Sequence, residues 1–168
     1  MSLFRTACAL LLSGLLWVCL DVRALADDRP LLKITKFNIA IDGFDEDSEA
    51  CGLSSPYLEA AARMAAKRAP FSIEDGIDEN SALYLLVDTF KSKDLCITHI
   101  YLTASYDYLT QLPASPDPQM GHVTLWENTS FVVTNHNRQV HLAAVIGEVN
   151  GRISELVREW QKQNSSPI

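Results

Sequence analysis

Hydrophobic and polar residues alternate along several stretches of the chain, with the period of two that is typical of β-strands. Within the first stretch, Phe37 and Ile39 fall on one side and Lys36 on the other. A later stretch is almost continuously apolar, which predicts a central strand. The predicted strands cover residues 31–41, 82–90, 95–109 and 122–135, and residues 71–73 allow a further short one.

Two segments have the period of a helix instead. Ser55 and Pro56 form a cap and first-turn pair, and Pro70 ends the helix near Ala69. A second helix is predicted over residues 139–163, where apolar residues recur every three or four positions. These apolar residues are Leu142, Val145, Ile146, Val149, Ile153, Leu156, Val157 and Trp160. Gly147 and Gly151 share one face of this helix, and we interpret them as allowing close approach to the sheet or to the other helix.

The order strand, helix, strand, strand, strand, helix predicts an α+β fold. Its architecture is a two-layer sandwich, with a mixed or antiparallel sheet of about four strands and two helices on one face. A helical crossover between the first two main strands makes them parallel, whereas the remaining strands can form an antiparallel meander.

The N-terminal segment has the layout of a secretory signal peptide. Residues 7–20 form an apolar run of 14 residues, followed by Ala24, Ala26 and acidic residues. The run is shorter than the roughly 20 residues that a membrane-spanning helix needs. We therefore predict a signal peptide at residues 1–26, a single domain at 27–168 and a periplasmic or secreted location, without membrane insertion after cleavage. An uncleaved N-terminal anchor stays open as an alternative, because the segment before the cleavage site is unusually polar.

The chain is acidic. Its 168 residues include 14 Lys and Arg and 21 Asp and Glu, for a net charge of −7. Removal of Arg5, Asp21 and Arg23 with the leader makes the net charge −8. Such a domain repels phosphates, so nucleic acid and anionic membrane surfaces are poor partners.

Two cysteines, Cys51 and Cys96, remain after cleavage. An even pair in an oxidising compartment predicts a disulfide, which would close a segment of 46 residues. The chain-entropy relation gives such a bridge about 4 kcal/mol of stabilisation. The alternative is an enzyme in which Cys51, at a helix N-terminus, acts as nucleophile with a histidine as base. The acidic residues around Cys51 disfavour its thiolate.

Two acidic stretches contain carboxylates of the kind that bind calcium ions. They contain Asp45, Asp47 and Glu49 in the first and Glu74, Asp75, Asp78 and Glu79 in the second. The first stretch is not an EF-hand, because Ala50 stands where the loop needs Gly and Pro56 where it needs Glu. Solvated loops are the simpler interpretation, and a calcium-dependent module that uses both stretches remains an alternative.

No other catalytic or cofactor motif is present. The four histidines form no HExxH pair, no GxSxG elbow occurs and no glycine-rich phosphate loop follows a strand. We therefore assign no catalytic residue, cofactor or metal ligand. Trp126 shares a strand face with His122 and Thr124, where it could belong to a binding surface or pack under a helix.

One combination of features resembles known proteins. The motif CGLS at residues 51–54 precedes a helix, a strand pair that carries the second cysteine, a strand with a tryptophan and a long helix ending VREWQKQN. This order resembles small secreted bacterial proteins of uncharacterised function. It is also similar to the strand-helix-strand modules at the amino terminus of the Tol-system propeller protein and in outer-membrane secretion lipoproteins. The resemblance implies an envelope protein that works by contact, and it carries over no catalytic residues.

These observations together predict a non-enzymatic periplasmic or secreted binding or assembly module, whose partner is another envelope protein. The contact surface would be the exposed face of the sheet, an edge strand, or the proline-rich loop at residues 111–121.

Overall fold

A mixed five-stranded sheet with the order β2-β1-β3-β4-β5 forms the framework of the protein. β1 runs parallel to both β2 and β3, whereas β3, β4 and β5 form an antiparallel meander. The strands are β1 (Lys36–Asp42), β2 (Ser72–Glu74), β3 (Ser81–Ser92), β4 (Leu95–Thr110) and β5 (Gln119–Asn135). The predicted parallel pairing of the first two main strands, joined by a helix, is confirmed.

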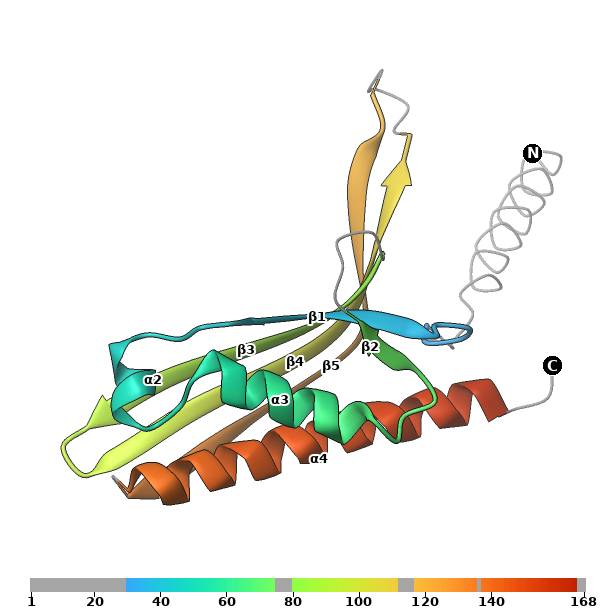
Figure 1. Ribbon diagram of the computed structural model, residues 1–168. Helices are drawn as coiled ribbons and strands as arrows, with labels where there is room; N and C mark the ends of the chain where they lie inside the picture. The colour runs from blue at the N-terminus through green and yellow to red at the C-terminus, as the bar shows by residue number, and fades with distance from the viewer. Residues whose placement is uncertain (1–29, 75–79, 112–116, 136, 166–168) are drawn as a thin grey trace, which may run out of the picture. The chain divides into compact units, whose positions relative to one another are not determined.

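The computed structural model describes residues 30–74, 80–111, 117–135 and 137–165, and the predicted signal peptide lies outside these ranges. Three helices occur in this part of the chain: α2 (Glu46–Ala50), α3 (Ser55–Ala66) and α4 (Arg138–Ser165). α3 and α4 lie side by side over one face of the sheet (Figure 1). The α+β class is therefore confirmed, but the predicted four strands and two helices become five strands and three helices.

The extra helix, α2, forms in the acidic stretch that we interpreted as a loop. Asp45 caps it, because its Oδ1 accepts hydrogen bonds of 2.9 Å from both the backbone N–H and the hydroxyl of Ser48. Glu46, Asp47 and Glu49 lie in the first turn, where the helix dipole favours negative charge. The acidic residues therefore have a local structural role, and a helix of five residues is too short to show a periodicity.

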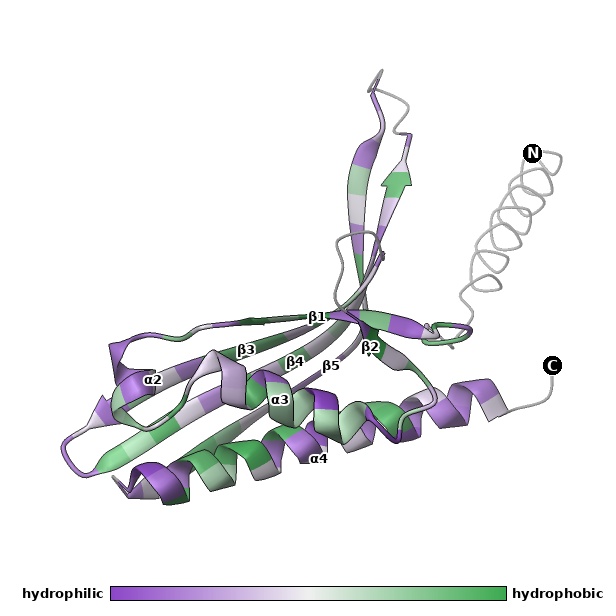
Figure 2. Cartoon of the chain, in the orientation of Figure 1, coloured by the Kyte–Doolittle hydropathy of each residue, from purple (hydrophilic) through white to green (hydrophobic). Residues whose placement is uncertain are grey.

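The hydrophobic core lies between the two long helices and the face of the sheet beneath them. Every second residue of β3 and β4 is buried there, and α3 and α4 each contribute one stripe. The fully buried members include Leu83, Leu85, Val87, Ile100, Leu102, Leu58, Val145, Val149, Ile153 and Leu156. Hydrophobic residues concentrate on the sides of α3 and α4 and in bands along the strands (Figure 2).

The last two strands continue beyond the rest of the sheet as a projecting hairpin (Figure 1). Tyr108–Thr110 of β4 pairs only with Gln119–Gly121 of β5 in the described residues. The ring of Tyr108 covers Gly121, where an added Cβ would lie 2.5 Å from the ring carbon Cζ. This hairpin lacks the helix layer, so its apolar side chains Leu109 and Met120 are about 70% exposed.

Our interpretation of Gly147 and Gly151 is wrong. Both glycines are exposed, and a Cβ added at either position would meet no atom within 4 Å. The outward face of α4 therefore carries them, and neither the sheet nor α3 makes the close approach that we expected.

Candidate functional site

The predicted disulfide between Cys51 and Cys96 is present and completely buried. It ties the residue that follows α2 to the start of β4 beneath the helix layer. Cys51 is the C-cap of α2, so it lies at the opposite helix terminus from the one that activates a thiolate. Bonded to Cys96, its sulfur has no thiolate form that could act as a nucleophile, and the thiol-enzyme alternative loses its reactive group in this state.

A buried histidine, His141 of α4, adjoins the disulfide. Its Nε2 lies 2.8 Å from the hydroxyl of Thr98, its Nδ1 lies 2.9 Å from the hydroxyl of Thr134, and the Thr98 hydroxyl is 3.0 Å from that of Thr89. Burial lowers the pKa of His141, because the charged imidazolium would lose its hydration. This group of three threonines and one histidine is a satisfied polar cluster inside the core, which sequence analysis did not predict.

Cys51, Cys96 and His141 bring metal-binding atom types within 4.8 Å of one another. Metals bind cysteine as the thiolate, however, and both sulfurs here are joined to each other. The two nitrogens of His141 also face threonine hydroxyls. The arrangement therefore acts as a structural junction between β4, β5 and α4 while the disulfide is intact.

The acidic stretches do not combine into a calcium site in the described residues. Asp45 caps α2, and an oxygen of Asp47 accepts a 2.9 Å hydrogen bond from the backbone N–H of Lys91. Glu74, on β2, interacts with Ser72 and lies 3.2 Å from the Nζ of Lys36. Asp75, Asp78 and Glu79 lie outside the described residues.

The other residues that we considered are separated in space. His122 lies on the projecting hairpin, 2.7 Å from the carboxylate of Asp107, and His136 lies outside the described residues. Trp126 packs against the helix-covered core, which favours the packing interpretation over the binding one. His99 lies on the opposite face of the sheet, where its ring stacks on Phe131 at a centroid distance of 4.7 Å.

That opposite face is the most distinctive surface of the protein, and we call it the open face, because no helix covers it in the described part of the chain. The strand register places Ile97 of β4 between Phe90 of β3 and Val133 of β5, and His99 between Asp88 and Phe131. Phe90, Phe131 and Val133 are 62%, 67% and 58% exposed. We define the open-face patch as Phe90, Ile97, His99, Phe131 and Val133.

Carboxylates lie along the open face on one side of the open-face patch. Asp42, Asp88 and Glu127 are exposed on the same face by strand alternation. Tyr101 donates a 2.6 Å hydrogen bond to Glu127, and Tyr84 donates a 3.3 Å hydrogen bond to Asp42. Burial and the charge of Asp42 raise the pKa of Tyr84 above its ordinary value. The open face therefore combines an apolar patch with carboxylates on one side of it.

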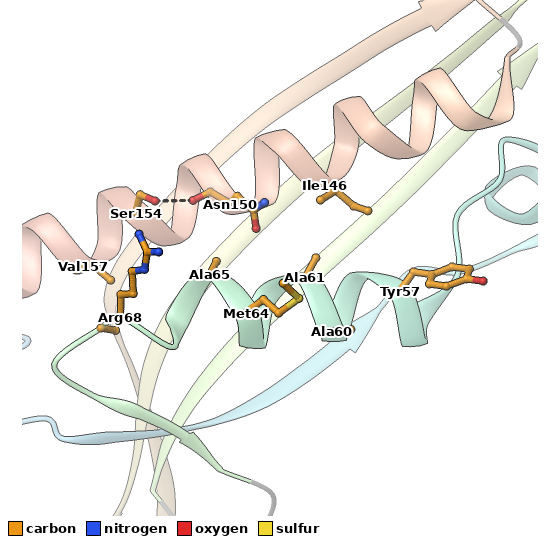
Figure 3. Close-up of a pocket in the computed structure, with 11 residues that line it drawn as sticks. Tyr57, Ala60, Ala61, Met64, Ala65, Arg68, Ile146, Asn150, Ser154 and Val157 are labelled. Atoms are coloured by element: carbon orange, nitrogen blue, oxygen red, sulfur yellow. Dashed lines mark hydrogen bonds between the residues drawn. The ribbon is translucent and has the colours of Figure 1, made fainter.

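A second concave feature lies on the helix side, where a groove of about 590 Å³ separates α3 from α4. Short side chains such as Ala61 and Ala65 form its α3 wall, while Ile146 and Asn150 of α4 point toward α3 (Figure 3). The guanidinium of Arg68 reaches toward Ser154 at one end. The groove results from packing two helices through small residues, and its only cationic lining residue is Arg68.

Comparison with known proteins adds no assignment. A scan against descriptions of protein families finds no family that matches the chain, and a search of curated proteins finds no significant match. Among the described residues, no helix combines the length and the apolar character required to cross a bilayer. A buried disulfide is compatible with an oxidising, extracytoplasmic compartment.

Sequence analysis considered the exposed sheet face as a contact surface but did not identify the residues of the open-face patch. A signal existed, because Phe131 and Val133 lie on the same side of β5 as Glu127 and Thr129, opposite buried Val132. Alternation showed that these residues share a face. It could not show that this face stays uncovered.

Proposed function

We propose that this protein is a contact module that binds another envelope protein through the open face of its sheet. The observation that carries the proposal is the open-face patch: three large apolar side chains, each more than half exposed, lie on β3 and β5 and flank Ile97 and His99 of β4 between them. A contiguous apolar patch with a polar border is typical of protein interaction sites. The helices already cover the other face, so the core does not require these residues.

The chemistry of the site supports binding over catalysis. Cys51 is held in the disulfide, and His141 is enclosed by threonines. On the open face, His99 contacts Thr129 through Nε2 and stacks on Phe131, an arrangement that presents a flat aromatic surface. Stacked aromatic groups of this kind supply large contact area with little loss of side-chain entropy.

Site-specific photo-crosslinking in the producing cells tests the proposal. A benzophenone amino acid replaces Phe131 in one variant and, in a control, Met64 of α3, which lines the groove between α3 and α4. Phe131 and Met64 are both 67% exposed, so the two probes are matched in accessibility. We expect a discrete adduct with another protein only from position 131.

Val133→Lys in the same chain should abolish that adduct, because it places a positive charge among the apolar side chains of the open-face patch. An equal pattern of adducts from positions 131 and 64, or none from position 131, would overturn the proposed function.

A further inference from the structure

The two edge strands of the sheet, β5 and β2, differ in length and in charge. β5 pairs only with β4 in the described residues, so alternate backbone N–H and C=O groups along its 17 residues point away from the sheet. β2, at the other edge, has three residues, and the ion pair of Glu74 with Lys36 lies beside it. A short, charged edge is protected against pairing with a further strand, whereas β5 has neither property.

The sequence of β5 also lacks the usual protective residues. Edge strands of soluble proteins commonly carry Lys or Pro, which oppose pairing with a further strand. β5 reads QMGHVTLWENTSFVVTN, which contains no Lys, Arg or Pro. Glu127 is its only acidic or basic residue apart from His122. A register shift interrupts the strand at Leu125, so residues 127–135 beyond it are the part that remains competent to accept a neighbour along the outer edge.

An added strand would extend the open face as well as the hydrogen-bond ladder. Neighbouring strands lie about 4.8 Å apart, and every second side chain of each points to the same face. Side chains of the added strand would thus lie directly beside Phe131 and Val133 of β5. The backbone edge and the open-face patch form one continuous surface for a single extended segment.

The charges on the open face indicate what kind of segment can pair with β5. Asp42, Asp88 and Glu127 lie on the same face on one side of the patch, and the only Lys or Arg on this face of the described strands is Lys36, which is paired with Glu74. A second copy of the chain would bring the same carboxylates to the interface, with a net charge of −7 on each molecule. A basic segment removes that repulsion and is attracted to the same carboxylates.

We propose that the partner contributes a basic, extended segment that pairs with β5 as a sixth strand of the sheet. Apolar side chains of this segment cover Phe131 and Val133, and its Lys or Arg side chains lie near Glu127, which is on the same face of β5. This inference rests on the proposed function, because it states the chemistry of the partner for the same surface.

The test uses two synthetic peptides and the intact, disulfide-bonded protein. Both peptides are nine residues long, with blocked ends and Thr at every second position. The positions between the Thr residues, which share one face of a strand, carry Val at one end and Arg at the other in the first peptide, and Val and Glu in the second. We expect the Arg peptide to protect amides of residues 127–135 from hydrogen exchange and to bind at least about tenfold more tightly than the Glu peptide. Its affinity should fall as salt is added.

A matched pair of variants separates the site from the overall charge of the protein. Phe131→Lys and Met64→Lys change the net charge equally at side chains of equal exposure, on opposite sides of the molecule. Phe131→Lys should weaken binding of the Arg peptide about tenfold or more, and Met64→Lys should leave the affinity within about twofold. Equal weakening by both variants, or protection of amides outside β5, would overturn the inference.

The two proposals fail in different ways. An adduct from position 131 without protection of β5 by the Arg peptide would overturn the basic strand and leave the contact function standing. An adduct with twice the mass of the chain would show a second copy at this surface, which also overturns the basic partner. The absence of both the adduct from position 131 and the amide protection of β5 would overturn both proposals.

Discussion

The two faces of the sheet are built from the same strands, yet they differ in what covers them. In β3, Leu85 is fully buried beneath the helices, and its neighbour Leu86 lies on the open face. In β5, Val132 is buried and Phe131 is 67% exposed. The residue types are alike, so their composition does not explain the difference.

The difference shows that apolar residues on this sheet have two separate roles. Those beneath α3 and α4 stabilise the fold, and they surround a junction that joins the disulfide to His141. Those on the open face contribute less to stability and remain available for contact. Changes on the covered face should therefore alter stability, whereas changes on the open face should alter binding.

Breaking the disulfide should have the largest effect on stability, because it belongs to the covered face. Reduction frees a segment of 46 residues, which corresponds to about 4 kcal/mol in the chain-entropy relation. Urea unfolding with and without a phosphine reductant measures the loss. A Cys51→Ser/Cys96→Ser variant should match the reduced protein and be insensitive to the reductant. An unchanged midpoint on reduction would contradict the structural role.

Adjacent leucines provide the sharpest comparison of the two faces. Leu85→Ala should lower the free energy of unfolding by about 3 kcal/mol, because it leaves a cavity in the core. Leu86→Ala removes the same atoms from the half-buried open side and should lower it by about 1 kcal/mol. Urea unfolding of both variants tests this difference, and equal losses would show that the open face is covered in solution.

The buried histidine should make stability depend on pH. Burial lowers the pKa of His141 in the folded protein, so the unfolded chain takes up this proton first as the pH falls. Stability is therefore fully present above the unfolded value of about 6.5 and is lost as the pH falls below it, by at most about 1.4 kcal/mol per pH unit. Unfolding at pH 7.5 and 5.5 measures the slope, and His141→Gln should reduce it. A steeper slope in the variant would contradict the assignment.

Replacing two glycines by alanine should change the stability of the protein in opposite directions, and these should be the smallest of the effects. Gly147→Ala should stabilise the protein by up to about 1 kcal/mol, because the exposed α4 position has room for a Cβ and gains helix propensity. Gly52→Ala should destabilise it, because Gly52 has a φ of +88° and an added Cβ would lie 2.8 Å from the Cβ of Arg138. Thermal unfolding compares them. A loss of stability in Gly147→Ala would show that another body contacts α4 there.

Long elements with a clear period could be predicted from the sequence. β3, β4 and α4 occur within a few residues of the predicted bounds, because each repeats its pattern over many positions. The short elements α2 and β2 could not be predicted with equal clarity. α2 depends on the cap that Asp45 provides, and β2 on parallel pairing with β1. The first strand begins at Lys36 instead of residue 31. The backbone N–H groups of Leu31 and Lys33 donate hydrogen bonds to the side chains of Gln163 and Asn164 of α4 instead of to a neighbouring strand.

The sequence by itself determined the strand and helix periods, the α+β class and the pairing of Cys51 with Cys96, because these depend on local repetition and on the number of cysteines. Only the tertiary structure decided which face of the sheet is covered, which edge stays unpaired and that His141 lies beside the disulfide. Periodicity states which residues share a face. Contacts between residues far apart in the chain, made as α3 and α4 pack on the sheet, determine whether that face meets the core or the solvent.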